Sequence, residues 1–328
     1  MKKLLLILIF LFLQFETAPM AKVVETACPY SYDMLKQDIS KINHTYKKVE
    51  VKGIGKTHFG RTIYGIKLGE GKRSIVLIGA HHGREWMTSM LLMKKLEGYT
   101  KAYQNQTDFG TFSTKILNDV SIWFIPMLNP DGVTIQQNTL DKFPYVHRKH
   151  LLSMNEGVDN FERWKANGLG VDLNRQYPAG WKELNHQPDS PSYQFYKGRR
   201  PLEAKEVKVL TQFIREINPV IAVAYHSSGE EVFWNYHNGK HLHRDKQIAK
   251  KVSKLTGYKL AKPPKQATGG GFTDWFITHY RRPAMTIEIS PLVGETSPPL
   301  SVFETEWERN KYVGLTLAEE AKQLNKRK

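Results

Sequence analysis

Hydrophobic and polar positions follow two different spacings along this chain. Short apolar runs typical of buried strands cover residues 74–79, 120–127, 220–225 and 284–289. Residues 49–54 and 61–68 alternate like two paired strands, with a turn at Gly60 between them. Apolar residues at helical intervals predict helices over 32–42, 86–99, 201–217, 242–255 and 306–325, the third opened by Pro201.

Strands and helices therefore alternate, which favours an α/β fold. We expect a mixed, mostly parallel twisted sheet flanked by helices. Residues 129–132 (Asn-Pro-Asp-Gly) predict a turn, and residues 137–170 read as a long irregular polar loop of a kind that is usually functional. No repeat or flexible linker divides the chain, so a single domain with its core between about residues 30 and 320 is expected.

The N-terminus predicts export. Three residues, Met1-Lys2-Lys3, precede an unbroken apolar run over residues 4–13, which is typical of a secretory signal peptide and too short to span a membrane. We expect residues 1–21 to be the signal peptide and 22–328 the folded protein, with an uncleaved signal-anchor as the alternative. Cys28 is the single cysteine, and a secreted protein without a disulfide favours a bacterial source, with the protein secreted or associated with the cell wall.

The net charge of +16 points to anionic partners. Loss of residues 1–21 removes Lys2, Lys3 and Glu16 and leaves +15. Outside a cell, anionic wall polymers are the polyanions at hand, so electrostatic binding to them is expected. The basic residues are dispersed and form no stripe interleaved with aromatics, so we expect no nucleic-acid binding, and we expect a monomer.

Residues with metal and acid–base chemistry follow the predicted strands. His82 and Glu85 come after the run at 74–79, His226 follows the run at 220–225, and Glu288 stands inside the run at 284–289. Two nitrogen or oxygen ligands with a third from elsewhere are typical of catalytic zinc. Each residue alone is more often a hydrogen-bonded histidine or a structural ion pair. A carboxylate in an apolar run needs a partner or a raised pKa.

Taken together, five motifs resemble the M14 zinc carboxypeptidases over residues 30–320. In chain order they are His82-x-x-Glu85, Asp172-Leu173-Asn174-Arg175, His226-Ser227, Gly270-Gly271-Phe272-Thr273-Asp274-Trp275 and Glu288. The amino-acid sequence of residues 79–88 and 163–167 is most similar to that of Bacillus-type secreted members. Those include the γ-D-glutamyl-L-diamino acid (diaminopimelate) peptidases, which act on peptidoglycan stem peptides.

The resemblance implies a metal site and a base. One zinc ion per chain would be held by His82, Glu85 and His226, and Asp172 would orient His82. Glu288 would take a proton from the water that zinc activates and pass it to the leaving amine. His81, one residue further from Glu85, is expected to be a neighbour of the site.

The resemblance also implies contacts with the substrate. Asn174 and Arg175 would hold a substrate carboxylate, and Arg84 would line the approach. A cation from the 137–170 region would stabilise the oxyanion; Arg163 and Lys165 are both candidates, and Lys165 is favoured because it follows the tryptophan. Thr273 would face the side-chain pocket and implies neither aromatic nor basic specificity.

Three functions fit these residues. The first is a zinc peptidase that cuts γ-D-glutamyl–diaminopimelate bonds of wall peptides. The second is a general zinc carboxypeptidase that removes ordinary C-terminal residues. The third is an inactive wall-binding module, and the complete set of His82, Glu85, His226 and Glu288 speaks against it.

Overall fold

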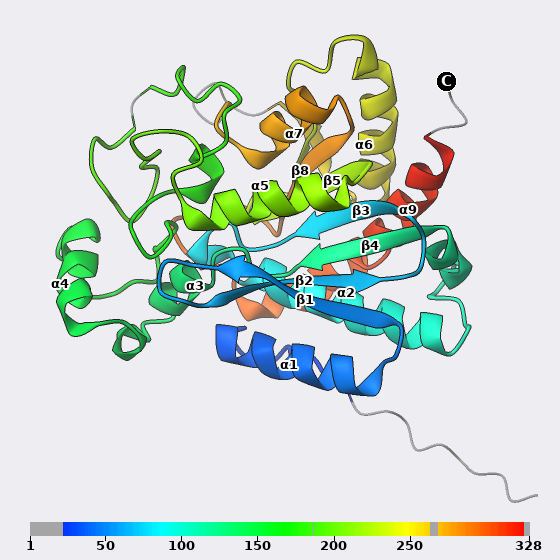
Figure 1. Ribbon diagram of the computed structural model, residues 1–328, viewed down its shortest axis with the longest axis horizontal. Coiled ribbons are helices and arrows are strands. Elements are labelled where there is room, and N and C mark those ends of the chain that lie inside the picture. The colour runs from blue at the N-terminus through cyan, green and yellow to red at the C-terminus, as the bar shows by residue number, and fades with distance from the viewer. Residues whose placement is uncertain (1–21, 186, 263–267, 325–328) are drawn as a thin grey trace, which may run out of the picture.

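A computed structural model describes residues 22–185, 187–262 and 268–324 of the chain. The expected signal peptide, residues 1–21, lies outside the described residues. Within them, a mixed sheet with strand order β1-β2-β4-β3-β5-β8-β6-β7 forms the centre of the molecule (Figure 1). Its strands are β1 (Val49–Lys56), β2 (Thr62–Leu68), β3 (Arg73–Ile78), β4 (Val120–Ile125), β5 (Ile221–Ser227), β6 (Glu231–Phe233), β7 (Lys259–Ala261) and β8 (Ala284–Ile289).

The central strands are parallel, and this arrangement positions the site. β4, β3, β5 and β8 pair in parallel, whereas β1, β2 and β6 join the sheet through antiparallel pairs. The carboxyl ends of β3, β5 and β8 therefore meet at one edge. The register places His226 of β5 beside Glu288 of β8. The expected mixed, mostly parallel sheet is confirmed.

Helices cover both faces of the sheet. Alternate residues of β3 face opposite cores: Ile75 and Leu77 pack in one, Val76 and Ile78 in the other. The first core receives α1 (Tyr32–Thr45), α2 (Met87–Gln104), α6 (Leu242–Thr256), α8 (Phe303–Asn310) and α9 (Val313–Gln323); the second receives α5 (Lys205–Ile217) and α7 (Phe272–Tyr280). No helix among the described residues is both long and apolar enough to span a membrane.

Several predicted helices have different limits in the structure. α5 begins at Lys205, and Pro201 lies in the turn before it, because Ala204 has an extended backbone conformation. The helix expected over 306–325 is two helices, α8 and α9, separated at Lys311 and Tyr312. The Lys311 carbonyl at this break accepts a hydrogen bond from the Tyr99 hydroxyl.

The predicted turn at 129–132 is the start of α3 (Pro130–Gln136). Asn129 caps this helix by accepting a hydrogen bond from the Gly132 amide at 2.9 Å, and Pro130 occupies the first turn. The expected irregular loop at 137–170 contains α4 (Tyr145–Met154), which projects to the left in Figure 1. A small separate core, in which Leu151 packs with Phe161 and Trp164, orders this segment.

Candidate metal centre and substrate cleft

A tight turn after β3 presents the first two candidate ligands. Residues Gly83–Glu85 form a single helical turn, so His82 and Glu85 project toward the same point. A side chain at Gly83 would collide with the Gly132 carbonyl, at 2.4 Å from the position of a β-carbon. The turn is fixed further by Thr88, whose hydroxyl donates to the Glu85 carbonyl at 2.7 Å and accepts from the Ala80 amide at 2.8 Å.

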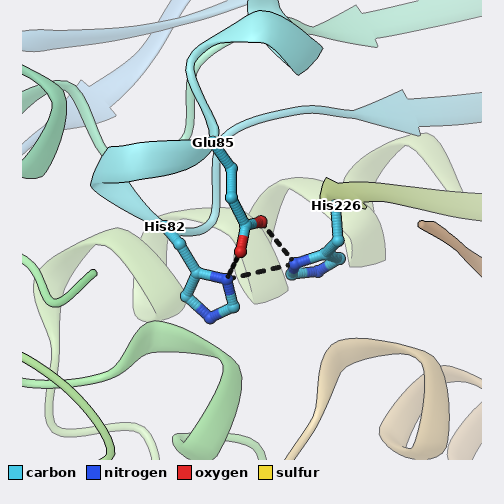
Figure 2. A group of neighbouring side chains, drawn as sticks. All are labelled: His82, Glu85 and His226. Atoms are coloured by element: carbon cyan, nitrogen blue, oxygen red, sulfur yellow. Dashed lines mark hydrogen bonds and ion pairs between the residues drawn. The ribbon is translucent and has the colours of Figure 1, made fainter. Parts of the chain in front are cut away.

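His226, at the end of β5, completes a group of three buried side chains (Figure 2). Glu85 lies between the two imidazoles: Oε1 is 2.7 Å from His82 Nδ1, and Oε2 is 2.9 Å from His226 Nδ1. The two Nδ1 atoms are 3.2 Å apart. One potential ligand atom from each of the three side chains lies within 4.8 Å of the other two. Two imidazole nitrogens and a carboxylate are a donor set that suits catalytic zinc.

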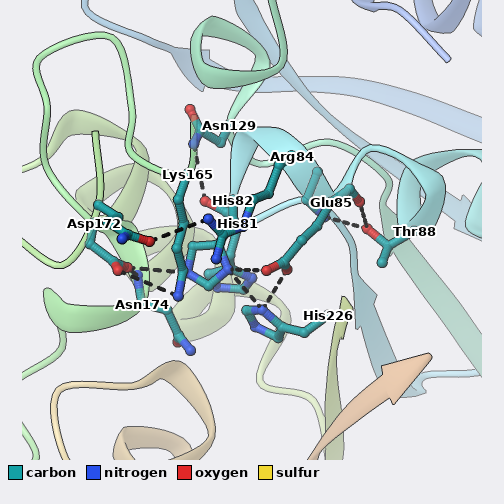
Figure 3. Close-up of polar contacts among 12 residues, drawn as sticks. His81, His82, Arg84, Glu85, Thr88, Asn129, Lys165, Asp172, Asn174 and His226 are labelled. Atoms are coloured by element: carbon teal, nitrogen blue, oxygen red, sulfur yellow. Dashed lines mark hydrogen bonds and ion pairs between the residues drawn. The ribbon is translucent and has the colours of Figure 1, made fainter. Parts of the chain in front are cut away.

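Asp172 stands behind His82, on the side away from Glu85 (Figure 3). Its Oδ1 atom is 3.1 Å from His82 Nε2, and the Lys165 ammonium is 3.8 Å from its Oδ2 atom. A proton on Nε2 leaves Nδ1 with a free lone pair on the side of Glu85 and His226. The local geometry therefore selects the tautomer of His82 that can ligate a metal through Nδ1.

The carboxylates of the centre have pKa values displaced in opposite directions. Burial raises the pKa of the Glu85 carboxyl, but His82 and His226 outweigh burial and hold that pKa well below its usual range. Burial also raises the pKa of Asp172, but the Lys165 charge and the contact with His82 outweigh burial and hold that pKa well below its usual range. Glu288 is the opposite case, because burial and the nearby Glu85 charge raise its pKa well above the ordinary value.

The centre opens into a cleft of about 260 Å³. Glu288 lines it from β8, and Asn174 and Arg175 line it from the short turn Leu173–Arg175. Asn174 is fixed because its Oδ1 atom accepts a hydrogen bond from the Phe272 amide at 3.0 Å. Arg175 Nε is buried and has no hydrogen-bond partner among the described residues. The pair can therefore meet a carboxylate that enters the cleft.

The structure separates the two candidate cations. Lys165 lines the cleft, whereas Arg163 is absent from the residues that line it. The Arg163 guanidinium instead lies 2.8 Å from Glu156 and 3.9 Å from the centre of the Tyr193 ring. The geometry thus supports Lys165 as the cation beside the three candidate ligands, His82, Glu85 and His226, and places Arg163 in the 137–170 segment outside the cleft.

Arg84 and Thr273 also border the cleft. Arg84 is held by the Gln194 side chain at 3.2 Å and by the Arg163 carbonyl at 3.1 Å. Thr273 and Thr286 share a hydrogen bond of 2.8 Å between their hydroxyls. This part of the cleft wall is small and polar.

His81 is a neighbour of the centre and is not part of the group of three. Its Nε2 atom is 3.2 Å from the Tyr177 hydroxyl, and its ring stacks on His226 with centres 5.1 Å apart. Burial, with added repulsion from His226 and His82, holds its pKa well below the ordinary value. This histidine therefore stays neutral and supports the ring of His226.

Several residues in or beside the cleft were given no role from the sequence. Asp274 lines the cleft next to Thr273, and burial raises its pKa to about 6. Gln194 holds Arg84 from a distant segment. Asp274 belongs to a motif that was recognised and could have been found there, whereas nothing in the sequence marks Gln194. Other residues that line the cleft are Ser227, Ser228, Trp234, Asn235 and Leu292.

Comparison with known proteins finds related sequences. The sequence profile of the zinc carboxypeptidase family (Peptidase_M14) matches residues 35–313. A γ-D-glutamyl-L-diamino acid endopeptidase 1 of Lysinibacillus sphaericus is 32% identical over 279 residues, covering 84% of this chain and 69% of that protein. The uncharacterized protein YqgT of Bacillus subtilis is 31% identical over 278 residues, covering 84% of this chain and 73% of that protein.

Solved structures share the fold at low sequence identity. Bovine thrombin-activatable fibrinolysis inhibitor, in complex with a tick carboxypeptidase inhibitor, has a TM-score of 0.73 and 17% identity, covering 92% of this chain and 99% of that chain. Carboxypeptidase A from Helicoverpa armigera has a TM-score of 0.65 and 18% identity, covering 91% of this chain and 75% of that chain. These likenesses establish the fold.

Proposed function

The chain belongs to the zinc carboxypeptidase family, and from this premise we propose that it cleaves γ-D-glutamyl–diaminopimelate bonds in peptidoglycan stem peptides. One observation carries the proposal. A single cleft brings together the metal group of His82, Glu85 and His226, the Glu288 carboxylate, and the Asn174–Arg175 pair. A peptide whose free carboxylate reaches Arg175 would present its scissile bond between the metal group and Glu288.

Separate residues would carry the separate steps of peptide-bond hydrolysis. When bound to His82, Glu85 and His226, zinc supplies a Lewis acid that activates water and polarises a carbonyl. Glu288 takes the proton of the attacking water and delivers it to the leaving amine; a raised pKa suits a group that both accepts and returns a proton. Lys165, beside the metal group, stabilises the negative charge that develops on the carbonyl oxygen.

Two further observations support a wall peptide as the substrate. A relative that is 32% identical carries the name γ-D-glutamyl-L-diamino acid endopeptidase. The cleft wall formed by Thr273 and Thr286 is polar, and the Asp274 carboxyl beside it offers an acid to a second amino group. A polar leaving residue with two amino groups is the kind of ligand that such a wall accommodates.

General carboxypeptidase activity is the second candidate. The Asn174–Arg175 pair would hold the terminal carboxylate of any peptide. A metallocarboxypeptidase A of Trichophyton rubrum is 30% identical over 203 residues, covering 59% of this chain and 43% of that protein. An inactive wall-binding module is the third candidate. The buried metal group and the base make it the weakest, because binding alone requires neither.

Peptide cleavage tests the proposal directly. The purified protein, loaded with zinc, is incubated with L-Ala-γ-D-Glu-diaminopimelate and, separately, with acylated dipeptides of ordinary residues. We expect release of diaminopimelate at a higher kcat/KM than any ordinary residue. Amidation of the terminal carboxylate should abolish cleavage. Release of ordinary residues alone would replace the first candidate with the second.

A chelator experiment separates both peptidase candidates from the binding module. Activity that is lost with a chelator and restored by zinc excludes the module; a zinc-loaded protein inactive on every peptide favours it. The proposal also includes export through residues 1–21 and action at the cell wall as a monomer held there by electrostatic attraction. Its basis is the apolar N-terminal run and the net charge of +16.

A further inference from the structure

A second groove lies at the opposite ends of the strands that carry the metal centre. It has a volume of about 690 Å³ and is bordered by Val220, before β5, and Pro283, before β8. His226 and Glu288 stand near the carboxyl ends of the same strands. Val220 and His226 are six positions apart along an extended chain, which corresponds to roughly 20 Å. A ligand in the groove would therefore leave the cleft open.

Basic side chains dominate this groove, and they come from separate elements of the fold. Those at the start of α6 face those at the end of α7 and the entry to β8. The basic lining consists of Lys240, His241, His243, Arg244, Arg281 and Arg282. Among the described residues that line the groove there is no aspartate or glutamate. We name this surface the basic groove.

Little of this charge is neutralised within the protein. Asp245, at 2.8 Å, pairs with Arg244 but is buried beneath it. Arg282 donates to the Asn218 side-chain oxygen at 2.7 Å and to the Pro219 carbonyl at 2.9 Å, and neutral acceptors leave its charge uncompensated. Lys240 and Arg281 are exposed. Burial, and then the Arg244 charge, lowers the pKa of His241, consistent with a positive local field.

The chemistry of the lining indicates the kind of anion. Guanidinium groups bind phosphate oxygens through two parallel hydrogen bonds, and several fixed cations along one groove suit a chain of regularly spaced charges. Tyr280 is the one phenylalanine, tyrosine or tryptophan among the described residues that line it, beside the imidazole rings of His241 and His243. Recognition of single-stranded nucleic acid relies on several aromatic side chains that stack on bases, so a phosphate chain without bases fits better.

We propose that the basic groove binds a linear phosphodiester polyanion that lacks nucleobases, of the poly(glycerol phosphate) type. The binding site itself does not depend on the peptidase activity. Its use, retention of the enzyme beside its substrate while the cleft stays free, rests on the proposed function.

Binding of the full-length protein to soluble poly(glycerol phosphate) tests this inference. The Lys240→Gln, Arg281→Gln double variant removes two exposed cations of the groove without touching the cleft. We expect about tenfold or greater loss of affinity at 0.1 M salt, and a smaller dependence of affinity on salt concentration. Circular dichroism and the zinc content of each variant show that the fold is retained.

A matched control removes the same charge elsewhere. Lys56 on β1 and Lys101 on α2 are exposed and lie outside the basic groove. The Lys56→Gln, Lys101→Gln variant should bind the polymer like the unmodified protein. Equal losses in both double variants would show that only net charge matters and would overturn the assignment.

Two further ligands complete the test. Single-stranded DNA of equal charge, and vesicles of phosphatidylglycerol and phosphatidylcholine, are compared with the polymer. Tighter binding of either one through Lys240 and Arg281 would overturn the choice of ligand. Cleavage of the small stem peptide is measured in parallel and should be equal in all variants. An inactive protein that still binds the polymer through the groove would refute the proposed function and leave this inference standing.

Discussion

Asp172 holds His82 from behind: its Oδ1 atom accepts a hydrogen bond from His82 Nε2 at 3.1 Å, and this contact leaves His82 Nδ1 directed at Glu85. The same carboxylate lies 3.8 Å from the Lys165 ammonium. One buried side chain therefore connects a candidate metal ligand with the candidate oxyanion cation.

This contact predicts the effect of Asp172→Asn. Loss of the charge removes the partner that selects the His82 tautomer, so zinc affinity should fall by about 10- to 100-fold. A titration against a chromophoric chelator measures it. The control is Asp131→Asn, because Asp131 is equally buried but pairs with Arg61, at 2.7 Å, outside the centre. An unchanged zinc affinity in Asp172→Asn would exclude the orienting role.

Glu288→Gln should separate catalysis from metal binding. The amide cannot take the proton of the water, so kcat should fall by about 10²- to 10⁴-fold while the zinc content stays at one per chain. His226→Ala should instead lower the zinc content, because it removes one of three ligand atoms. Elemental analysis and turnover of the same peptide distinguish the two. Near-normal turnover in zinc-loaded Glu288→Gln would show that another group is the base.

The choice of oxyanion cation can be settled by two parallel substitutions. Lys165→Met removes the ammonium that lines the cleft and should lower kcat by about 10²- to 10³-fold, with a smaller effect on KM. Arg163→Met removes a guanidinium paired with the exposed Glu156, so kcat should change little. Steady-state kinetics of both variants decide the matter; the reverse pattern would assign the role to Arg163.

Glu206 predicts a dependence of stability on pH. This carboxyl is fully buried at the start of α5, and burial, with repulsion from Asp131, raises its pKa to about 7. The folded state binds the proton more tightly than the unfolded chain, whose pKa is near 4.5. Stability from this group is therefore present below about pH 4.5 and is lost as the pH rises to about 7.

Glu206→Gln should remove that loss. Glutamine can still accept the hydrogen bond from the Asn167 amide, which is 3.2 Å from Glu206 Oε2. At pH 8 the variant should be more stable by up to about 3 kcal/mol, and near pH 4 the two proteins should differ little. Urea denaturation at both pH values checks this. Equal stability at pH 8 would mean that the carboxylate is compensated in the folded protein.

Much of the fold follows from local patterns. The apolar runs identify β3, β4, β5 and β8, because a strand buried on both faces needs apolar side chains at every position. Helix limits are less predictable: the extended backbone of Ala204 delays the start of α5, and Lys311, which is bound by the distant Tyr99, lies at the break between α8 and α9. The three-residue strands β6 and β7 have no distinct pattern: β6 pairs with the edge of β8, and β7 pairs in turn with β6.

The sequence by itself identified the family of this protein and its candidate metal ligands. His82, Glu85 and His226 follow or end apolar runs, and Glu288 stands inside one. Five motifs in the same order as in the zinc carboxypeptidases indicated the family, because a metal site needs particular donor atoms and the residues that carry them can be recognised in a sequence. Only the tertiary structure placed Lys165 in the lining of the cleft and Arg163 outside it, although the two residues are close in sequence. It also placed Asp274 in the cleft and gathered the basic groove from separate elements. Such choices depend on where side chains point after packing, which no local pattern encodes.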